Sequence, residues 1–480
     1  MKEKISSMTE YHRTLLMDPE LVESSTGTTL TVNPPLAVRP VIVPDKPWEA
    51  FMINFYTSVI DEGGKLRLWY NCRDKDRKFH VACAESEDGI NWTKPALGLT
   101  GFEGSTANNL VSGTDFFAGN VFRDPHAASP DAAYVCVSSV FKGFAPPSEC
   151  AIYRYTSPDG LRWKRDAEPL LAFEADSQNV TLWDEKSGRY VLFLRGWDLH
   201  DPAGRARRVV RLELDTLDRP TGIKPTGRGQ TKEPERTPFI ADEIPTVFAC
   251  DALDPVHTDV YTSAVHPYGA QGEWLVGFPS MYRQDTGSPY PDDGRTEIQF
   301  IASRDGKKWL RFGQAPYVAP GLEGSASASM IYIGAGLVER GDEVWHYGTV
   351  YRTTHGDEPA RVKQLDGTVC RFLQRIDGFV SLNFAPGGGR CLTRPVPVTG
   401  GTLKLNVDTG ALGEARVGLL DENGHEIPGF GVDECEPLRL NATGAGVRWK
   451  ERADLAPLQG RQVRLLVVAA RARLFSFRFS

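Results

Sequence analysis

Acidic side chains recur beside the predicted starts of several strands along this 480-residue chain. We single out four of them as candidate catalytic groups: Asp124, Asp176, Asp259 and Glu49. Two carboxyl groups in one cavity can divide acid and base roles, because burial or a like-charged neighbour keeps one protonated while the other stays ionised. Glycosidic bond cleavage uses such a pair: one carboxyl protonates the leaving oxygen, and the other attacks the anomeric carbon or activates water.

Hydrogen-bonding and aromatic side chains of the kind that bind sugars lie near the same strand starts. The candidate substrate-binding residues are Trp48, Asn120, Arg123, Gln178, Asn179, His257, Tyr261 and His355. Each acid alone has a structural explanation, since Asp often caps turns and strand ends. The recurrence at corresponding positions is therefore the stronger observation.

Other kinds of site find little support in the sequence. The chain has no Gly-x-Ser-x-Gly elbow, no His-Glu-x-x-His, no phosphate-binding Gly-Lys-Ser/Thr loop and no Rossmann fingerprint. Asp254, His257 and Asp259 lie close in sequence, but their spacing is not one known for metal ligands. We therefore expect no cofactor and no metal ion.

A repeated seven-residue motif marks the strands that must position the candidate residues. Ser-x-Asp-Gly-x-x-Trp occurs at residues 86–92, 157–163 and 303–309. The Trp residues are 71 and 146 residues apart, so one unit spans about 72 residues, and residues 211–218 take the place of a degenerate copy. The Asp-Gly pair favours a hairpin turn, and the Trp can pack on the preceding strand.

A strand pair joined by a polar turn belongs to every unit. The five predicted pairs join residues 57–60 to 68–70, 119–122 to 134–136, 180–183 to 190–192, 260–262 to 274–276, and 336–338 to 344–347. Five units of four strands predict an all-β fold, a five-bladed β-propeller whose inner strands converge on one funnel. The alternative is a row of β-sandwiches, which would require Greek-key connections and units of about 100 residues.

The pattern changes after residue 388. Period-two alternation at residues 403–407 and 463–467 predicts a separate β-sandwich over 390–480. This unit either binds carbohydrate or supports the propeller, and the absence of an aromatic triplet from its sequence favours support. We assign 35–388 to the propeller as the catalytic domain and 1–34 to an N-terminal extension. Residues 219–238 are expected to form a long loop, either a solvated excursion or a lid or oligomer contact.

Composition narrows the class of protein. Hydrophobic residues at 41% and charged residues at 24% are typical of a globular protein. The net charge of −7 offers no basic field for nucleic acid, and no apolar run is long enough to span a membrane. The N-terminus shows no secretory signal, and the eight scattered cysteines indicate a reducing compartment, so we expect a cytoplasmic protein. Assembly into a homo-oligomer stays open.

Five blades followed by a sandwich resemble the invertase and levanase type of glycoside hydrolase (family 32) and, more loosely, furanosidases of family 43. The most specific match is Arg123-Asp124-Pro125, which is similar to that family's second-blade Arg-Asp-Pro, whose Asp steadies the transition state. The resemblance implies that the acid is Asp176 or Glu174, and it makes furanosides candidate substrates without carrying over fructoside specificity. The family's first-blade Trp-x-Asn-Asp-Pro-Asn motif is absent, and Pro47-Trp48-Glu49 is a distant counterpart, which implies a divergent relative.

The sequence thus predicts a glycoside hydrolase that cleaves terminal sugars from oligo- or polysaccharides. One alternative is a carbohydrate-binding propeller without a working acid pair. The other is a glycoside phosphorylase, which requires cationic side chains beside the acids; the candidates for that role are Arg195, Arg283, Arg352 and His355.

Overall fold

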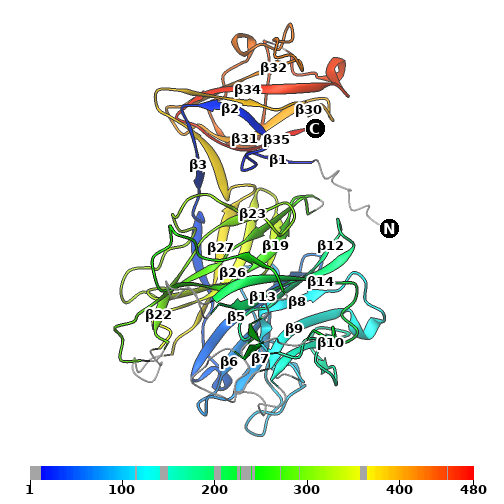
Figure 1. Cartoon of the computed structure of the whole chain (residues 1–480), viewed down its shortest axis with the longest axis vertical. Helices are drawn as coiled ribbons and strands as arrows, with labels where there is room; N and C mark the ends of the chain where they lie inside the picture. The colour runs from blue at the N-terminus through cyan, green and yellow to red at the C-terminus, as the bar shows by residue number, and fades with distance from the viewer. Residues whose placement is uncertain are drawn as a thin grey trace. The chain divides into compact units, whose positions relative to one another are not determined.

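The structure, a computed structural model, describes residues 12–113, 116–140, 150–173, 175–198, 207–223, 227–228, 239–240, 244–270, 272–290, 292–356, 365–450 and 452–480. Regular structure in these residues is almost entirely β (Figure 1). The chain divides into two compact units. The propeller unit contains Pro34–Pro267 and Trp274–Gln374; the sandwich unit contains Met1–Asn33, Tyr268–Glu273 and Arg375–Ser480.

The propeller unit consists of successive antiparallel sheets in which neighbouring strands along the chain pair with one another. The first sheet is β5 (Met52–Asp61), β6 (Leu66–Arg73) and β7 (Phe79–Ser86). The second is β8 (Val121–Arg123), β9 (Tyr134–Val140), β10 (Ala151–Ser157) and β11 (Lys164–Arg165). The third is β12 (Val180–Asp184), β13 (Arg189–Trp197), β14 (Arg207–Leu214) and β17 (Thr246–Phe248).

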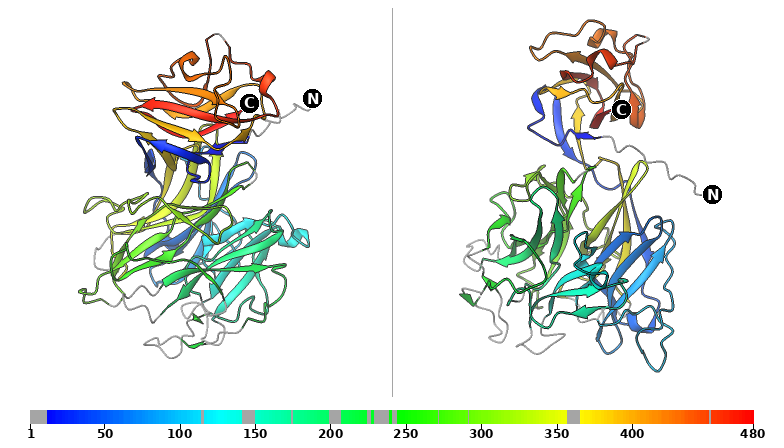
Figure 2. Two further views of the ribbon diagram at one scale, coloured as in Figure 1. Left: turned by 45° about the horizontal axis from the view of Figure 1, so that its top comes forward. Right: turned by 90° about the vertical axis from the view of Figure 1, so that its right-hand side faces the viewer.

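The fourth sheet bends, so that each of its first three strands is interrupted once and its segments form two smaller sheets. Its members are β18 (Thr258–Thr262), β19 (Val265–Tyr268), β20 (Trp274–Gly277), β21 (Ser280–Gln284), β22 (Gly294–Ile298), β23 (Ile301–Ser303) and β24 (Leu310–Arg311). The fifth sheet is β25 (Met330–Arg340), β26 (Glu343–Tyr351), β27 (Thr368–Arg375) and β4 (Ala37–Ile42). The all-β class and the propeller followed by a sandwich are confirmed, and Figure 2 shows the sheets from two further sides.

Strands from the two ends of the propeller unit close its ring. β4 pairs antiparallel with β27, with Val38 opposite Phe372, and so completes the last sheet with an early segment of the chain. The first and last sheets also meet at their inner strands, where β5 lies parallel to β25 with Ser58 opposite Ala335. Because a closed ring leaves only short strand edges exposed, this pairing protects the sheets from edge-to-edge association.

Each Ser-x-Asp-Gly-x-x-Trp motif forms a capped turn after the third strand of its sheet. In the second sheet, Ser157 Oγ accepts the backbone N–H of Gly160 at 2.9 Å, and Asp159 accepts those of Leu161 and Arg162 at 2.9 Å. The Gly160 carbonyl then accepts the indole N–H of Trp69 in the first sheet at 2.7 Å. The motif therefore joins one blade to the blade before it.

Replacing Gly160 with Ala should destabilise the protein more than a matched change at Gly188. Both glycines have positive φ, +73° and +62°, so each substitution costs about 1 kcal/mol or more in backbone strain. A Cβ at Gly160 would lie 2.7 Å from the Trp69 ring, whereas one at Gly188 meets nothing within 4 Å. Denaturant unfolding should show a further ~1–3 kcal/mol lost at Gly160. Equal losses in the two variants would contradict the packing role of this turn.

Four of the five predicted strand pairs form as predicted, and the fourth sheet differs. The sequence pairs residues 260–262 with 274–276, whereas Val260 lies opposite Met281 in β21. Residues 274–277 form β20, which pairs with β19. The chain bends at Ala264, between β18 and β19, where φ is +40°. As a result β18 pairs with β21, and β19 pairs with β20.

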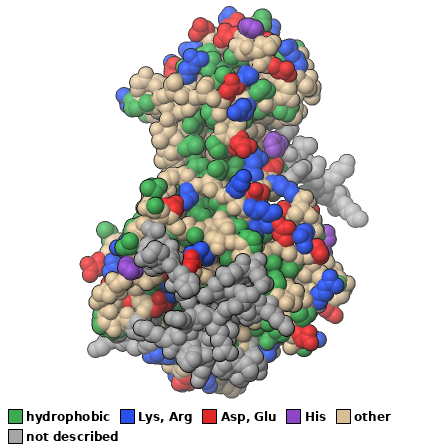
Figure 3. Space-filling view, viewed as in Figure 1, with side chains coloured by type: hydrophobic (Ala, Val, Ile, Leu, Met, Phe, Trp, Pro, Cys, Tyr) green, Lys and Arg blue, Asp and Glu red, His purple; other side chains and the backbone are tan. Residues whose placement is uncertain are grey.

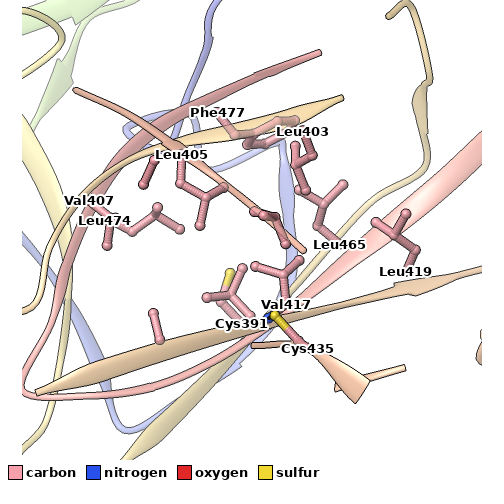
Figure 4. Close-up of a cluster of buried hydrophobic side chains, with 14 of the residues drawn as sticks. Cys391, Leu403, Leu405, Val407, Val417, Leu419, Cys435, Leu465, Leu474 and Phe477 are labelled. Atoms are coloured by element: carbon pink, nitrogen blue, oxygen red, sulfur yellow. Dashed lines mark hydrogen bonds between the residues drawn. The ribbon is translucent and has the colours of Figure 1, made fainter. Parts of the chain in front are cut away.

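The sandwich unit contains two sheets that enclose an apolar core (Figure 4). One sheet is β1 (Thr14–Leu15), β3 (Thr28–Val32), β28 (Val380–Phe384), β35 (Arg473–Phe479), β31 (Leu403–Asp408) and β33 (Asn441–Gly446). The other is β2 (Val22–Thr26), β29 (Gly389–Thr393), β34 (Gln462–Ala470), β30 (Val396–Pro397) and β32 (Glu414–Leu420).

The pairing of an early segment moves the expected boundary of this unit. Residues 14–32, expected as an extension, supply three strands to the sandwich sheets because they pair with β28, β29 and β35.

Cys391 and Cys435 lie in the core of the sandwich unit. Burial raises the pKa of the Cys391 thiol to about 11, so it is a small apolar side chain at neutral pH.

Among the described residues on the face drawn in Figure 3, Lys and Arg are interspersed with Asp and Glu. No helix among the described residues has the length and apolar character needed to cross a membrane. The predicted loop at 219–238 lies largely outside the described residues, as does Glu174.

Candidate active site

Asp124 lies just after the end of its strand, whereas the other candidate acids lie near the starts of theirs. Asn120 Oδ1 accepts the backbone N–H of Thr181 at 2.7 Å, which aligns the starts of β8 and β12. Asp124 follows the end of β8, whereas Asp176 precedes β12, so the two carboxyl groups lie toward opposite ends of the inner strands. The Tyr190 hydroxyl binds both oxygens of Asp124, at 2.8 and 3.0 Å.

Glu49 and Trp48 belong to a buried network in the first sheet rather than to the axis. Glu49 has no exposed surface and accepts hydrogen bonds from the Tyr70 hydroxyl at 2.7 Å and from Lys94 Nζ at 2.7 and 2.8 Å. The indole of Trp48 donates to Asn109 Oδ1 at 2.9 Å. These contacts are those of a structural anchor, in which the cation offsets the burial of the carboxylate.

Asp176 instead lies in a cluster of charged and aromatic side chains at the start of the inner strands. Its Oδ2 is 3.1 Å from Nη1 of Arg195, whose side chain is 1% exposed while that of Asp176 is 36% exposed. Arg195 also donates to the backbone carbonyl of Tyr261 at 2.8 Å and lies 4.1 Å from the centre of the Tyr261 ring. The arginine therefore holds a partly exposed carboxylate against the strand that carries Tyr261.

Arg207 links two further carboxylates. Its backbone N–H and Nη1 bind Asp259 at 2.9 and 2.7 Å, and its Nη2 binds both oxygens of Asp292 at 2.9 and 3.0 Å. Asp259 is fully buried and also accepts from Gln284 Nε2 at 2.6 Å, whereas the side chain of Asp292 is 47% exposed. Asp259 thus fixes the position of Arg207, and Arg207 in turn holds the partly exposed carboxylate of Asp292.

The backbone of Asp292 is held by two aromatic donors. Its carbonyl oxygen accepts the Tyr282 hydroxyl at 2.6 Å and Nδ1–H of His355 at 2.7 Å. Because a carbonyl oxygen only accepts, His355 carries its proton on Nδ1, and its Nε2 accepts the Tyr261 hydroxyl at 2.9 Å. Burial lowers the pKa of His355, which keeps this imidazole neutral.

The charge of the cluster sets the protonation of Asp292. Burial alone would raise the pKa of this carboxyl, but the Arg207 guanidinium outweighs it, and the pKa lies below the usual value for Asp. Burial also raises the pKa of Tyr261. At neutral pH the cluster therefore holds an ionised Asp292 beside a protonated phenol.

Both partly exposed carboxylates sit on strained backbone. Asp176 has a φ of +33° and Asp292 a φ of +54°, in a region that residues other than Gly seldom adopt. Such conformations persist only where surrounding contacts impose them, and they occur most often at functional sites. Here the imposing contacts are those of Arg195 and Arg207.

An aromatic-walled pocket of about 210 Å³ adjoins His355. Its lining residues are Phe51, Met52, Asn54, Phe55, Arg73, Met330, Tyr351, Thr353, Thr354 and His355. The Phe55 ring stacks on the His355 ring, with centroids 6.4 Å apart and planes 23° apart. Aromatic faces beside hydroxyl groups are suited to a sugar ring, which has an apolar face and polar edges.

Of the predicted substrate-binding residues, Tyr261 and His355 join the cluster. Gln178 donates to the carbonyl oxygens of Gly119 and Ile333, at 3.1 and 3.2 Å, and so ties inner strands together. Asn179 donates to Ser139 Oγ at 3.3 Å. His257 is exposed just before β18, and Arg123 lies 5.5 Å from the Tyr134 ring centre at the end of β8.

Two members of the cluster were not predicted, Arg207 and Asp292. Arg207 starts β14, four residues before the degenerate repeat copy at 211–218, and Asp292 lies in Tyr290-Pro291-Asp292-Asp293-Gly294, which has the composition of an ordinary turn. Among the described residues, no group of three His, Cys, Asp or Glu side chains has the arrangement of a metal site.

A buried histidine near the axis gives a testable pH dependence. His266 in β19 accepts the Gly336 N–H on Nδ1 at 3.2 Å, and burial lowers its pKa to about 4. Because the unfolded chain binds this proton near pH 6.5, the stability from neutral His266 is present above that pH and is lost as pH falls toward 4.

Replacing His266 with Asn should therefore flatten the loss of stability on acidification. Urea unfolding between pH 7 and 4 should show the wild type losing up to about 3 kcal/mol more than the variant. The matched control is His425→Asn, whose side chain is 79% exposed and should leave the wild-type slope unchanged. Identical slopes for all three proteins would exclude this role of His266.

No protein-family model matches the chain, and no curated protein matches it. Solved structures with a similar fold include a glycosyl hydrolase from Bacteroides ovatus, with 13% identity and a TM-score of 0.42, covering 71% of this chain and 93% of that chain. A thermostable family-43 glycoside hydrolase has 11% identity and a TM-score of 0.40, with 70% and 92% covered.

A third similar structure comes from glycoside hydrolase family 130, a family of mannoside phosphorylases that contains hydrolases acting on β-1,2-mannosidic linkages in Candida mannan. It has 13% identity and a TM-score of 0.41, and the match covers 75% of this chain and 96% of that chain. Identities this low assign the chain to none of these families, and the resemblance to invertases stays a prediction.

Proposed function

We propose that this protein is a glycoside hydrolase that removes terminal sugars from oligo- or polysaccharides, with Asp176 and Asp292 as its catalytic carboxyl groups. The observation that carries the proposal is the pair itself. Both side chains are partly exposed, each is bound by a buried arginine, and both lie in the cluster beside the aromatic pocket. Glycosidic cleavage needs two carboxyl groups in one cavity.

The environments of the two acids divide their roles. Asp292 is ionised because Arg207 lowers its pKa, so it serves as the group that attacks the anomeric carbon or activates water. Asp176 contacts Arg195 through one oxygen, so its other oxygen can face the glycosidic oxygen, and we assign this residue to the leaving-group side. Asp259, without exposed surface, acts through Arg207 as a positioning residue.

The pocket beside His355 receives the terminal sugar. Phe55 and Tyr351 offer apolar faces, and Thr353, Thr354 and Arg73 offer hydrogen-bonding groups around them. A small pocket of this kind favours exo cleavage of single terminal residues, furanosides among them.

The cluster gives less support to a phosphorylase. Its two buried arginines are occupied, Arg195 by Asp176 and Arg207 by Asp259 and Asp292. With three aspartates against two arginines, an incoming phosphate would meet net negative charge. Of the other cationic candidates, Arg283 lines a different cleft.

A substrate screen tests the proposal. The full chain is assayed against chromogenic furanosides and pyranosides, with and without inorganic phosphate. Hydrolysis that does not depend on phosphate and is lost in both Asp176→Asn and Asp292→Asn supports it. Cleavage that requires phosphate would identify a phosphorylase, and binding of sugars without turnover would identify a carbohydrate-binding protein; either result overturns the proposal.

A further inference from the structure

The sheet that carries Asp259 has a second face with chemistry of its own. Successive residues of a strand point to opposite faces. In β21, Tyr282 and Gln284 bind Asp292 and Asp259 on the face of the candidate active site. Met281 and Arg283 therefore point to the opposite face, together with Thr258 of β18, which lies directly opposite Arg283.

On that opposite face lies a cleft of about 350 Å³, larger than the pocket beside His355. This volume is within the range of about 300–1,000 Å³ that small-molecule sites occupy. Leu253, Pro255, Met281 and Pro320 form an apolar wall, and Arg283 and Arg295 contribute the cationic groups.

The two arginines are unusually placed for a pair without a ligand. They lie directly opposite each other on β21 and β22, where like charges destabilise a sheet. Both residues are exposed, and no carboxylate of the described residues forms an ion pair with either guanidinium. An anion that bridges both would remove the repulsion and form charge-assisted hydrogen bonds.

The acids of the cleft do not cancel this charge. Asp254 is bound by Arg311, whose Nη1 and Nη2 lie 2.9 and 2.7 Å from its two oxygens. Glu297 is the remaining carboxyl in the lining, so outside the Asp254–Arg311 pair two guanidinium groups face one carboxylate. The cleft is therefore cationic and apolar, on a chain whose net charge is −7.

We propose that this cleft is a second ligand site, separate from the candidate active site, and that it binds a small organic anion with an apolar body. Arg283 and Arg295 hold the anionic group, and the wall of Leu253, Pro255, Met281 and Pro320 holds the apolar part. The pairing of an apolar wall with two guanidinium groups is the complement of an amphipathic carboxylate or phosphate ester.

Calorimetric titration of the full chain tests this site with 3-phenylpropionate, its uncharged match 3-phenylpropanol, and inorganic phosphate. Saturable binding of 3-phenylpropionate is expected, at least tenfold tighter than that of either other probe, because each lacks one half of the ligand. Equal binding of the alcohol would show a merely apolar cleft, and equal binding of phosphate a merely cationic surface. Either result overturns the proposal.

Variants locate the binding. Arg283→Gln with Arg295→Gln should weaken 3-phenylpropionate at least tenfold, and Met281→Ala should weaken it severalfold. Arg390→Gln, an exposed strand arginine of the sandwich unit, should leave it unchanged. Asp292→Asn should also leave it unchanged, which separates this site from the proposed catalytic one. Wild-type affinity in folded Arg283/Arg295 variants would refute the assignment.

Discussion

Asp292→Asn is expected to lower kcat by roughly 10²–10⁴-fold while changing KM little. The substitution keeps the shape of the side chain and its strained backbone, which the Tyr282 and His355 hydrogen bonds to the carbonyl oxygen continue to hold. It removes the negative charge of the carboxylate that Arg207 binds. Steady-state kinetics on the substrate found in the screen measure the loss.

Asp124→Asn is the matched control for this experiment. Asp124 is also a partly exposed aspartate, but its carboxyl binds Tyr190 at the far end of β8. Turnover in this variant should stay within a few-fold of the wild type. If Asp124→Asn were the inactive protein and Asp292→Asn the active one, the catalytic centre would lie at the other mouth of the propeller.

The pH profile gives a second reading of the same site. Since Arg207 holds the pKa of Asp292 below the usual value, the acidic limb of kcat/KM should fall below about pH 3.9, the ordinary pKa of Asp. In Arg207→Met this limb should move to higher pH, because the cation that favours the ionised form is gone.

Arg207→Met is expected to cost about 3–5 kcal/mol of the free energy of unfolding. The change leaves Asp259 fully buried with no opposing charge, since the remaining side-chain donor is the neutral amide of Gln284. Denaturant unfolding by circular dichroism measures the loss. Arg208→Met is the neighbouring control, because the partner of Arg208, Asp198, is 34% exposed and keeps its hydration.

A second substitution should restore much of this stability. In Arg207→Met with Asp259→Asn the buried group is neutral, so the cost of an unpaired charge disappears and the double variant should be more stable than Arg207→Met alone. Additive losses in the double variant would mean that Arg207 stabilises the fold through packing and not through Asp259.

The repeats made the propeller predictable. The side chains of Ser157 and Asp159 form their hydrogen bonds within the turn itself, so their spacing in the sequence is the spacing in the structure. The strand pairs were predictable for the same reason, as each joins neighbours along the chain. The fourth predicted pair was wrong because the chain bends at Ala264, so that Val260 pairs with β21 and not with β20. No local sequence signal marks the residue at which a strand bends.

The site depends on contacts between distant segments, which residue spacing does not reveal. Arg207 binds both Asp259 and Asp292, yet Asp259 is fully buried and the side chain of Asp292 is partly exposed. The sequence does not reveal this difference between the two acids. Asp176 and Tyr261 were predicted because each lies by the start of an inner strand, as the propeller requires. Residues 14–32 pair with residues that follow them by 348 (Val32 with Val380) to 463 positions (Thr14 with Phe477), and nothing local indicates such partners.

The pairing of β4 with β27 has a consequence for synthesis. A chain that leaves the ribosome N-terminus first makes residues 37–42 long before residues 368–375, so the blades made early wait as an open arc. Nascent chains cut before residue 368 should therefore remain sensitive to proteases and adhere to one another through the uncovered border, and release of the full-length chain should be the step that confers resistance.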